Sequence, residues 1–356
     1  MLDAKAFPSI TVKLMARMPP DSLTRHFGRQ LPQATKSWGD CRFVFAPEAR
    51  DYDWLVVYHD IYRPAGGPGL EELACPRSRT ILVTTEPSSI TVYGTDYLRQ
   101  YGTIITSQEP WVFHHPRVIF TQPGLIWFYG FPFGEGPLRT YDKLQATPPP
   151  AKSKLIATVC SSRAGGLTLH RRRVRFTHKL QAELPELDVF GHGVRPMSDK
   201  AEALDPYQYH IAIENHVFRH HLTEKLPDAF LGYTLPFYHG CPNATDYFPR
   251  ESFIPINIGD FDRTLDIIRS TIANNEYRDR LPYIIESRRR VLEEHNLFAV
   301  LERYIRVHSG EHEDPGPSGR ARAAVIMNRQ TLRRKKPLIA VKSLIEKGLV
   351  KGRHYL

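Results

Sequence analysis

The sequence of 356 residues is short of the features that mark secreted and membrane-spanning proteins. It has only four cysteines, and no two of them stand in the C-x-x-C spacing of a zinc or redox motif. This scatter favours a reducing compartment over a disulfide framework. No apolar run reaches about 18 residues, so we expect no transmembrane helix. The opening MLDAKAFPSI lacks the charged, apolar and small-residue order of a secretory signal, and we expect a cytoplasmic protein.

Acidic residues are outnumbered, but only in one part of the chain. The net charge is +10, from 48 Lys and Arg against 38 Asp and Glu. Residues 319–356 contain eleven of these bases and a single acid, Glu346, which accounts for the whole excess. The rest of the chain is neutral, which argues against a nucleic-acid-binding fold because such folds carry basic surface on the domain itself. The basic segment indicates an anionic partner at the C-terminus.

Strand-like and helical stretches alternate along the sequence, which predicts an α/β fold, and the length suits two domains. Three consecutive prolines at 148–150 predict an extended, stiff connector. We therefore predict an N-terminal α/β domain over 1–146, a Pro-rich linker over 147–153, a second α/β domain over 154–308, and a flexible link with a basic amphipathic tail over 309–356. Two open α/β domains joined by a stiff connector imply a cleft between them, and ligands of open α/β sheets bind at the carboxyl ends of strands.

The expected strands are short, rich in Val, Ile and Phe, and bounded by turn residues. In the first half they span residues 9–15, 41–46, 54–59, 80–85, 102–107 and 117–121. In the second half they span residues 154–160, 187–190, 209–213, 234–238 and 252–256. Helices are expected over 167–184, 222–233, 261–273 and 276–307, where the folded part should end.

The densest polar cluster is IENHVFRHHLTEKL at 213–226. Glu214 and Asn215 follow a predicted strand, and Thr223, Glu224 and Lys225 open the next predicted helix. Free backbone N–H groups at a helix start, with a lysine beside them, suit a phosphate group. The alternative is a surface helix in which Thr223 is the cap and Glu224 complements the helix dipole.

Residues 209–260 resemble the C-terminal signature of glycosyltransferase family 10, the fucosyltransferases. The matching motifs are I-E-N-H at 213–216, H-L-T-E-K-L at 221–226, P-F-Y-H-G-C-P at 236–242 and S-F-I at 252–254. V-C-S-S at 159–162, R-V-R-F-T-H-K-L at 173–180 and T-T-E-P-S-S at 84–89 resemble further family segments in the same order. The resemblance is strongest over 154–260 and does not extend to the first 50 residues or the tail.

The resemblance implies a GT-B-like fold of two Rossmann-like domains and an inverting transfer of a sugar, with GDP-L-fucose as the expected donor. The acceptor is expected to be a hydroxyl of a surface glycan such as lipopolysaccharide. Glu86 would be the general base. Arg173 and Lys225 would hold the diphosphate, which makes a metal or other cofactor unnecessary. The other expected donor-site residues are Glu214, Asn215, His221 and Glu224.

Other interpretations of these residues stay open. His221 stands where relatives usually have Tyr, so the donor could be a different nucleotide sugar, and a non-catalytic glycan- or nucleotide-binding protein is a further alternative. Arg171, Arg172 or Arg175 could share the role of Arg173, or the whole basic run could be a solvated helix face. Glu86 could instead be a capping or hinge carboxylate. The D-x-D motif at 51–53 precedes a predicted strand, which favours a turn over a metal site.

The tail combines RRKKP at 333–337 with a possible amphipathic helix. Val341, Leu344, Ile345 and Leu349 can lie along one side of it, with Lys342, Lys347 and Lys351 elsewhere. This pattern suits a helix that lies in the plane of an anionic membrane surface, which would place the protein at the inner face of the cell membrane. The alternative is a solvated or disordered tail, because Gly348 and Gly352 weaken the helix.

Overall fold

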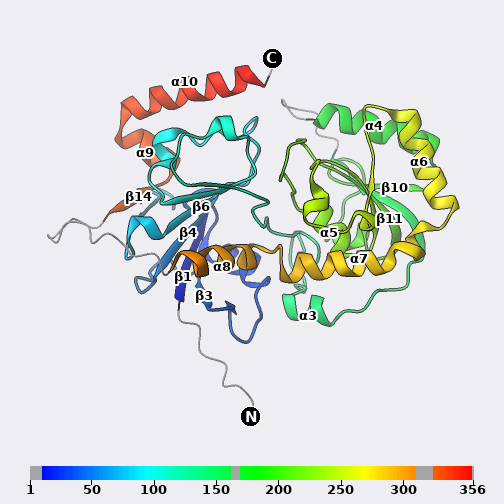
Figure 1. The fold of residues 1–356 in the computed structure, drawn as a ribbon, viewed down its shortest axis with the longest axis horizontal. Coiled ribbons are helices and arrows are strands. Elements are labelled where there is room, and N and C mark those ends of the chain that lie inside the picture. The colour runs from blue at the N-terminus through cyan, green and yellow to red at the C-terminus, as the bar shows by residue number, and fades with distance from the viewer. Residues whose placement is uncertain (1–9, 162–168, 310–323, 355–356) are drawn as a thin grey trace, which may run out of the picture. The chain divides into compact units, whose positions relative to one another are not determined.

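The computed structural model describes residues 10–161, 169–309 and 324–354, and the chain divides into two compact units. Unit 1 comprises residues 1–124 and 297–356, and unit 2 comprises residues 125–296. Each unit contains its own parallel sheet with helices packed against it (Figure 1). The predicted α/β class is therefore confirmed, while the predicted cleft between the domains stays a prediction.

The main sheet of unit 1 has seven strands in the order β2-β3-β1-β4-β6-β7-β8. They are β1 (Ile10–Ala16), β2 (Ser37–Trp38), β3 (Cys41–Val44), β4 (Trp54–Tyr58), β6 (Thr80–Val83), β7 (Thr103–Thr106) and β8 (Val118–Phe120). All neighbours run parallel except β2 and β3. Every residue of β4, β6 and β7 is buried, as expected for central parallel strands that are covered on both faces.

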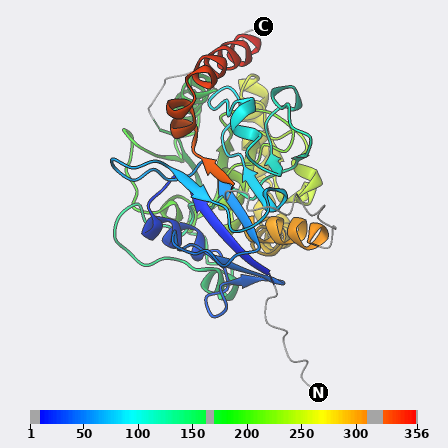
Figure 2. The same ribbon diagram turned by 90° about the vertical axis from the view of Figure 1, so that its left-hand side faces the viewer.

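Aromatic side chains attach helices to this sheet. The helices are α1 (Pro20–Gly28), α2 (Thr95–Leu98) and α8 (Leu297–His308). The rings of Phe27 in α1 and Tyr58 in β4 lie 5.0 Å apart, and those of Tyr304 in α8 and Trp54 in β4 lie 6.0 Å apart. Figure 2 shows α1 and α8 beside the strands of this sheet. Residues 297–308 therefore belong to the core of unit 1, although the sequence places them beside the helices of unit 2.

The C-terminal segment is a folded part of unit 1. Strand β14 (Val325–Met327) pairs antiparallel with β5 (Leu70–Glu72), and helices α9 (Arg329–Lys335) and α10 (Pro337–Arg353) follow. Ile326 and Leu332 are buried in the same hydrophobic cluster as Leu82 and Tyr97. The prediction that the folded part ends near residue 307 is therefore wrong, because two apolar side chains of this segment complete a core built by the first half. The amphipathic helix predicted in the tail is confirmed as α10, while residues 310–323 of the predicted link lie outside the described residues.

Unit 2 has a five-stranded parallel sheet in the order β10-β9-β11-β12-β13. The strands are β9 (Lys154–Val159), β10 (Leu187–Phe190), β11 (Tyr207–Ile213), β12 (Leu235–His239) and β13 (Ile254–Pro255). The helices are α3 (Tyr141–Ala146), α4 (His170–Glu183), α5 (Lys225–Leu231), α6 (Phe261–Ala273) and α7 (Glu276–Glu293). Short 3-10 helices complete the two units: Arg77–Arg79, Pro110–Val112, η3 (Lys200–Ala203), Ala244–Asp246 and Arg250–Ser252.

The predicted linker at 147–153 does not coincide with the division between the units, which falls after residues 124 and 296. Residues 147–153 are held within unit 2. The ammonium group of the half-buried Lys152 donates hydrogen bonds to the carbonyls of Leu204, Asp205 and Gly232 at 2.6–3.0 Å. Tyr233 donates to the carbonyl of Thr147 at 2.7 Å. The three prolines therefore form an extended stretch along the surface of unit 2 rather than a hinge.

The single helix predicted over 276–307 is divided into α7 and α8, and the division is where the chain leaves unit 2. The buried side-chain amide of Asn296 donates to the carbonyl of Leu292, which is an alternative to a continuing backbone ladder. Hydrophobic periodicity does not detect this break, because both helices keep a buried face.

Candidate functional site

A cavity of about 220 Å³ lies in unit 2 where its strand order reverses. From β9 the chain crosses first to β10 on one side and then to β11 on the other. Ligands of open α/β sheets bind beyond the carboxyl ends of strands at such a switch point. Val159 and Ser161 at the end of β9, and Ile213 and Asn215 at the end of β11, line this cavity, which we call the β9/β11 cavity.

Four of the predicted donor-site residues converge on the β9/β11 cavity. Arg173 comes from the first turn of α4, Asn215 follows β11, and Glu224 and Lys225 stand at the start of α5. The backbone around them packs closely. A side chain at Gly191, whose φ is +139°, would place its Cβ 2.5 Å from the carbonyl oxygen of Cys160. The adjoining residues 162–168, which include Ser162 of the predicted V-C-S-S motif, lie outside the described part of the chain.

The guanidinium of Arg173 has N–H donors that the described residues do not use. It is 6% exposed, and its Nη1 donates to Oδ1 of Asn215 at 2.7 Å. Its Nε is buried and has no hydrogen-bond partner among the described residues. No described carboxylate lies within ion-pair distance of it, and a guanidinium has five donors. Arg171, Arg172 and Arg175 of the same helix are exposed, so the structure favours Arg173 over these alternatives as the arginine of the cavity.

Glu214 is fully buried and positions the start of α5. Its carboxylate accepts hydrogen bonds from the backbone N–H of Thr223 at 2.9 Å and from the Thr223 hydroxyl, and it lies 3.3 Å from Nζ of Lys225. The Thr223 hydroxyl is therefore hydrogen-bonded to Glu214 and does not cap the helix, and the N-cap residue of α5 is Glu224. The alternative in which Thr223 caps a surface helix is therefore wrong. The predicted role of the helix start itself is also weak, because α5 has only seven residues.

Two charged residues that the sequence did not single out belong to the same cluster. Lys200, from η3, lies 3.4 Å from Glu224 and 2.8 Å from Asp228, and all three residues line the cavity. Asp228 is also accepting hydrogen bonds from the backbone of Phe128 and Tyr129, both at 3.0 Å. The sequence contains a signal for Asp228, because a residue four positions after Glu224 lies on the same face of a helix. Lys200 had no such signal, because it comes from a distant segment.

The charges of this cluster are stabilised by one another. Burial alone would raise the pKa of Glu224, but Lys225 and Lys200 hold it well below its usual range. Burial alone would lower the pKa of Lys200, and the carboxylates of Asp228 and Glu224 raise it above its usual value. In the same way Glu214 and Glu224 raise the pKa of Lys225 against the effect of burial. Glu224, Lys200 and Lys225 therefore stay charged at neutral pH, whereas burial raises the pKa of Asp228 above its usual value.

His221 is not among the residues that line the β9/β11 cavity. It is 1% exposed, and its ring lies 5.5 Å from the ring of His216. His210 lines the cavity instead, and burial, followed by the charge of Lys200, lowers its pKa to about 3. The histidine at this cavity is therefore neutral and uncharged under ordinary conditions.

Glu86 is in unit 1, in the loop after β6, and its side chain is exposed to solvent. The loop is held on both sides. The side-chain amide of Gln108 donates to the carbonyl of Glu86 at 2.6 Å, and the hydroxyl of Thr85 lies 2.8 Å from Nδ1 of His59. Glu86 therefore lies in a hydrogen-bonded loop at the carboxyl end of a buried parallel strand, as predicted.

No group of three or more His, Cys, Asp or Glu residues in the described ranges is arranged to hold a metal ion. The D-x-D motif has a structural role at its second carboxylate, because Asp53 accepts a hydrogen bond from the backbone N–H of Thr11 at 2.7 Å just before β4 begins. Asp51 and Tyr52 lie in irregular backbone and Asp53 in a bend, so the interpretation of this motif as a turn stays a prediction. All four cysteines lie in the described ranges, are buried and form no disulfide with one another. Among the described helices, none is both long enough and apolar enough to cross a membrane.

Comparison with known sequences matches the part of the chain that forms this cavity to a protein family. Residues 149–275 match the family model for glycosyltransferase family 10 (fucosyltransferase) C-term. The alpha-(1,3)-fucosyltransferase FucT of Helicobacter pylori is 30% identical over 96 residues, which cover 26% of this chain and 20% of that protein. The 4-galactosyl-N-acetylglucosaminide 3-alpha-L-fucosyltransferase FUT6 of Gorilla gorilla gorilla is 32% identical over 126 residues, 33% of each chain. The matched part of the chain thus spans a third or less of these relatives.

Comparison with solved structures extends over more of the chain. A crystal structure of an alpha1,3-fucosyltransferase superposes with a TM-score of 0.51 at 14% sequence identity, covering 88% of this chain and 92% of that one. At this level of identity the similarity concerns the fold. Together with the two parallel-sheet units, it confirms the predicted fold class of two Rossmann-like domains in a GT-B-like chain.

Proposed function

Because residues 149–275 carry the C-terminal domain of glycosyltransferase family 10, we propose that this protein is a glycosyltransferase that uses GDP-L-fucose as its donor. One observation carries the proposal: Arg173, Asn215, Glu224 and Lys225, all from motifs that resemble the family signature, line one cavity at the switch point of unit 2. The names of the two relatives, both fucosyltransferases, support the choice of donor sugar.

The β9/β11 cavity is proposed to bind the diphosphate of the donor. Negative charge grows on the diphosphate as its bond to the sugar breaks, and fixed cations stabilise that charge in the transition state. Arg173 offers donors that the described residues do not use, and its planar fork suits phosphate oxygens. Lys225 adds a positive charge whose place is set by the buried Glu214. Two fixed cations can do this work without a divalent metal.

The proposed reaction is a single displacement that inverts the anomeric carbon. The acceptor hydroxyl oxygen forms a bond to the anomeric carbon while the bond from that carbon to the diphosphate oxygen breaks. The hydroxyl proton passes to the carboxylate of Glu86, and GDP leaves with the bonding electron pair. An exposed carboxylate at a strand end is accessible to such an acceptor. We propose a hydroxyl of a surface glycan, such as lipopolysaccharide, as the acceptor.

Helix α10 is proposed to hold the protein at the inner face of the cell membrane. Its apolar side chains point to solvent: Leu338, Val341, Ile345 and Leu349 are 87%, 58%, 59% and 71% exposed. Such a stripe beside exposed lysines suits an in-plane helix at an anionic lipid surface.

A different nucleotide sugar is the second candidate donor, because His221 stands where relatives usually have Tyr. Since His221 is buried and outside the β9/β11 cavity lining, its influence on the donor would act through the residues around it.

A thermal-shift panel of GDP, UDP, ADP and CMP tests the donor proposal. A ligand that binds only the folded protein stabilises it, by about 2.7 kcal/mol at 100 times its dissociation constant. We expect GDP to raise the melting temperature most, and transfer of fucose from GDP-fucose to a glycan to follow. Stabilisation by UDP equal to that by GDP would reject the guanosine donor. Stabilisation by GDP without any transfer from GDP-sugars would favour the non-catalytic alternative.

A further inference from the structure

A second and larger cavity lies in unit 1, also at a switch point. The chain goes from β1 to β3 on one side of the sheet and then to β4 on the other. A cavity of about 920 Å³ lies beyond the carboxyl ends of β1 and β4. Its charged lining residues are Arg17, Asp60, Arg63, Arg329, Arg333 and Arg334, and we call it the arginine cavity. Ligands of open α/β sheets bind at this position, and no residue of the cavity has a role in the function proposed above.

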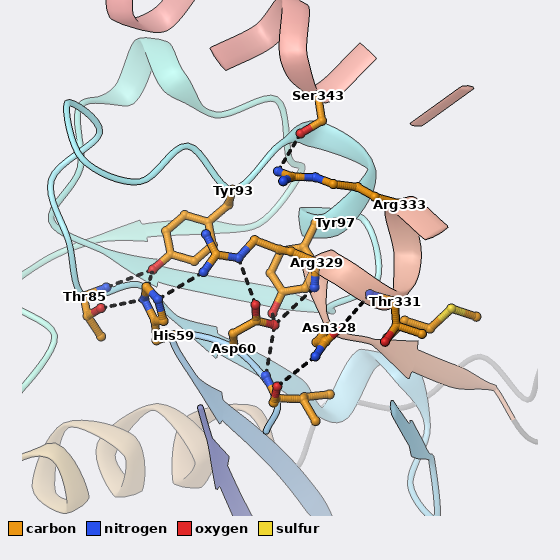
Figure 3. Close-up of polar contacts among 12 residues, drawn as sticks. His59, Asp60, Thr85, Tyr93, Tyr97, Asn328, Arg329, Thr331, Arg333 and Ser343 are labelled. Atoms are coloured by element: carbon orange, nitrogen blue, oxygen red, sulfur yellow. Dashed lines mark hydrogen bonds and ion pairs between the residues drawn. The ribbon is translucent and has the colours of Figure 1, made fainter. Parts of the chain in front are cut away.

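The one carboxylate of the arginine cavity is already neutralised. Oδ2 of Asp60 lies 2.9 Å from Nε of Arg329, and both side chains are largely buried. Its Oδ1 accepts hydrogen bonds from the Tyr97 hydroxyl at 2.9 Å and from the backbone of Ile61 at 3.0 Å. Figure 3 shows Arg329 held between Asp60 and His59. This pair contributes no net charge to the cavity.

His59 is neutral and adds no charge to the arginine cavity. A guanidinium can only donate, so Nε2 of His59 accepts from Arg329 at 3.0 Å, and Nδ1 carries the proton toward Tyr93 or Thr85. Burial, followed by the charge of Arg329, lowers the pKa of His59 to about 4. The histidine therefore stays neutral, as the positive surroundings require.

The remaining four arginines leave the cavity strongly cationic. None of Arg17, Arg63, Arg333 and Arg334 has a carboxylate within ion-pair distance in the described ranges. Arg333 donates to the Ser343 hydroxyl at 2.7 Å (Figure 3). Arg63 donates to the carbonyl of Gly67 at 2.9 Å, so both arginines are positioned by neutral partners that leave further donors available. Burial, followed by the charge of Arg329, lowers the pKa of Arg333. An anion in the cavity would relieve this repulsion.

We propose that the arginine cavity binds a phosphate or sulfate group carried by the acceptor saccharide. Arginine forks match the geometry of such oxyanions and bind them with two parallel hydrogen bonds. The volume exceeds what a single ion fills and lies in the range of cavities that enclose small organic ligands. The assignment of the ligand to the acceptor rests on the proposed function, in which unit 2 takes the donor. It narrows the acceptor to an anionic glycan.

Calorimetric titration of the full chain with glucose 6-phosphate, glucose and inorganic phosphate tests this proposal. The test variant is Arg17→Gln/Arg334→Gln, because both residues are exposed and neither supports the Asp60 network. The control is Arg263→Gln/Arg278→Gln, which removes the same charge from exposed positions of unit 2. We expect the wild-type protein and the control to bind glucose 6-phosphate and not glucose, and the test variant to bind it at least about tenfold more weakly.

Equal affinity of the test variant and the control for glucose 6-phosphate, or equal binding of glucose, would overturn the proposal. Binding of inorganic phosphate alone would overturn the part that assigns the site to a saccharide. Loss of binding to phosphatidylglycerol vesicles, with glucose 6-phosphate binding unchanged, would reassign the arginines to a lipid headgroup. GDP stabilisation is measured on the same variants. If GDP fails to bind while glucose 6-phosphate still depends on the arginines, the proposed function fails and the anion site stands.

Discussion

Arg173 and Lys225 differ in how much of their charge is already used by the protein. Lys225 lies 3.3 Å from Glu214 and 3.2 Å from Glu224, so its ammonium group is compensated before any ligand arrives. Arg173 contacts the neutral amide of Asn215, and its Nε has no hydrogen-bond partner among the described residues. At the scale of single residues, Arg173 is therefore the group with most to gain from an anion.

Replacing Arg173 with Gln should weaken GDP binding by about ten- to a hundredfold, because charge-assisted hydrogen bonds are lost. Arg175→Gln in the same helix serves as the comparison, since Arg175 is exposed. Titration calorimetry with GDP measures both. An equal loss in the two variants would mean that the basic helix face, and not the cavity, attracts the nucleotide.

Glu86→Gln should abolish sugar transfer, by at least about a hundredfold in kcat, because the amide cannot take the hydroxyl proton. GDP affinity should not change, since Glu86 is in unit 1 and the β9/β11 cavity, where we propose that GDP binds, is in unit 2. Steady-state transfer assays and GDP titration make the two measurements. Glu72→Gln, which changes an exposed carboxylate of β5, is the control. Undiminished turnover of Glu86→Gln would remove it as the base.

At the scale of elements, one face of α10 contacts the rest of unit 1 and the other face is exposed to solvent. Its inner face is fixed to unit 1 by polar contacts: Lys342 lies 2.8 Å from Asp96, and Glu346 accepts from the backbone of Thr95 at 3.1 Å. Its outer face presents the exposed apolar stripe. Ile339 on the inner face also packs against the hydrophobic cluster of unit 1, so the apolar residues of the outer face are not needed to hold the helix and are available for a different surface.

Ile345→Ser/Leu349→Ser should therefore reduce binding to phosphatidylglycerol vesicles by about tenfold or more, since less apolar area can enter the lipid. Val194→Ser/Val307→Ser is the control, because these valines are 45% and 66% exposed outside α10. Vesicle sedimentation gives the bound fraction. Melting temperatures should match in both variants, since both replace exposed side chains. Undiminished sedimentation of the α10 variant would exclude the outer face of α10 as the lipid contact.

At the scale of the whole molecule, both units place a cavity at the switch point of a parallel sheet and a neutral histidine beside it, which is half-buried in the case of His59 and buried in the case of His210. His59 lines the network of the arginine cavity, and His210 lines the β9/β11 cavity. Burial is the main cause of the lowered pKa in each case, and a neighbouring cation adds to it. The two units thus share an arrangement in which cations, and not titrating histidines, set the charge of the cavity.

These histidines predict that stability falls on acidification. Unfolded His59 and His210 would bind protons below their ordinary pKa of 6.5, while the folded chain binds them only near pH 4 and pH 3. Between those limits the unfolded state holds more protons, so the free energy of unfolding falls by up to about 1.4 kcal/mol per pH unit for each histidine. Urea titrations from pH 7 to 4 should show a smaller slope for His210→Gln and an unchanged slope for the exposed His178→Gln. Equal slopes in all three proteins would contradict the assignment.

Local sequence features predicted most elements correctly. Strand β10 and helix α6 have the expected bounds, and each of the other predicted strands differs by at most two residues at either end. The buried runs of β4 and β6 are continuous in Val, Leu and Ile, which marks central parallel strands in the sequence itself. The motif at 213–226 likewise identified Asn215, Glu224 and Lys225 of the β9/β11 cavity, because its residues are neighbours in the chain.

Only the tertiary structure decided how distant segments combine. The chain leaves unit 1 after residue 124 and returns to it at residue 297. Composition does not reveal these two positions, because neither has a linker-like composition such as that of residues 147–153. Lys200 joins Glu224 at the β9/β11 cavity, and Arg329 joins Asp60, through contacts between segments separated by 24 or more residues. Periodicity and motifs report burial and local spacing along a single chain segment. Which charges end up together depends on the order of strands in each sheet, and that order is set by long-range packing of cores such as the one that Ile326 and Leu332 complete.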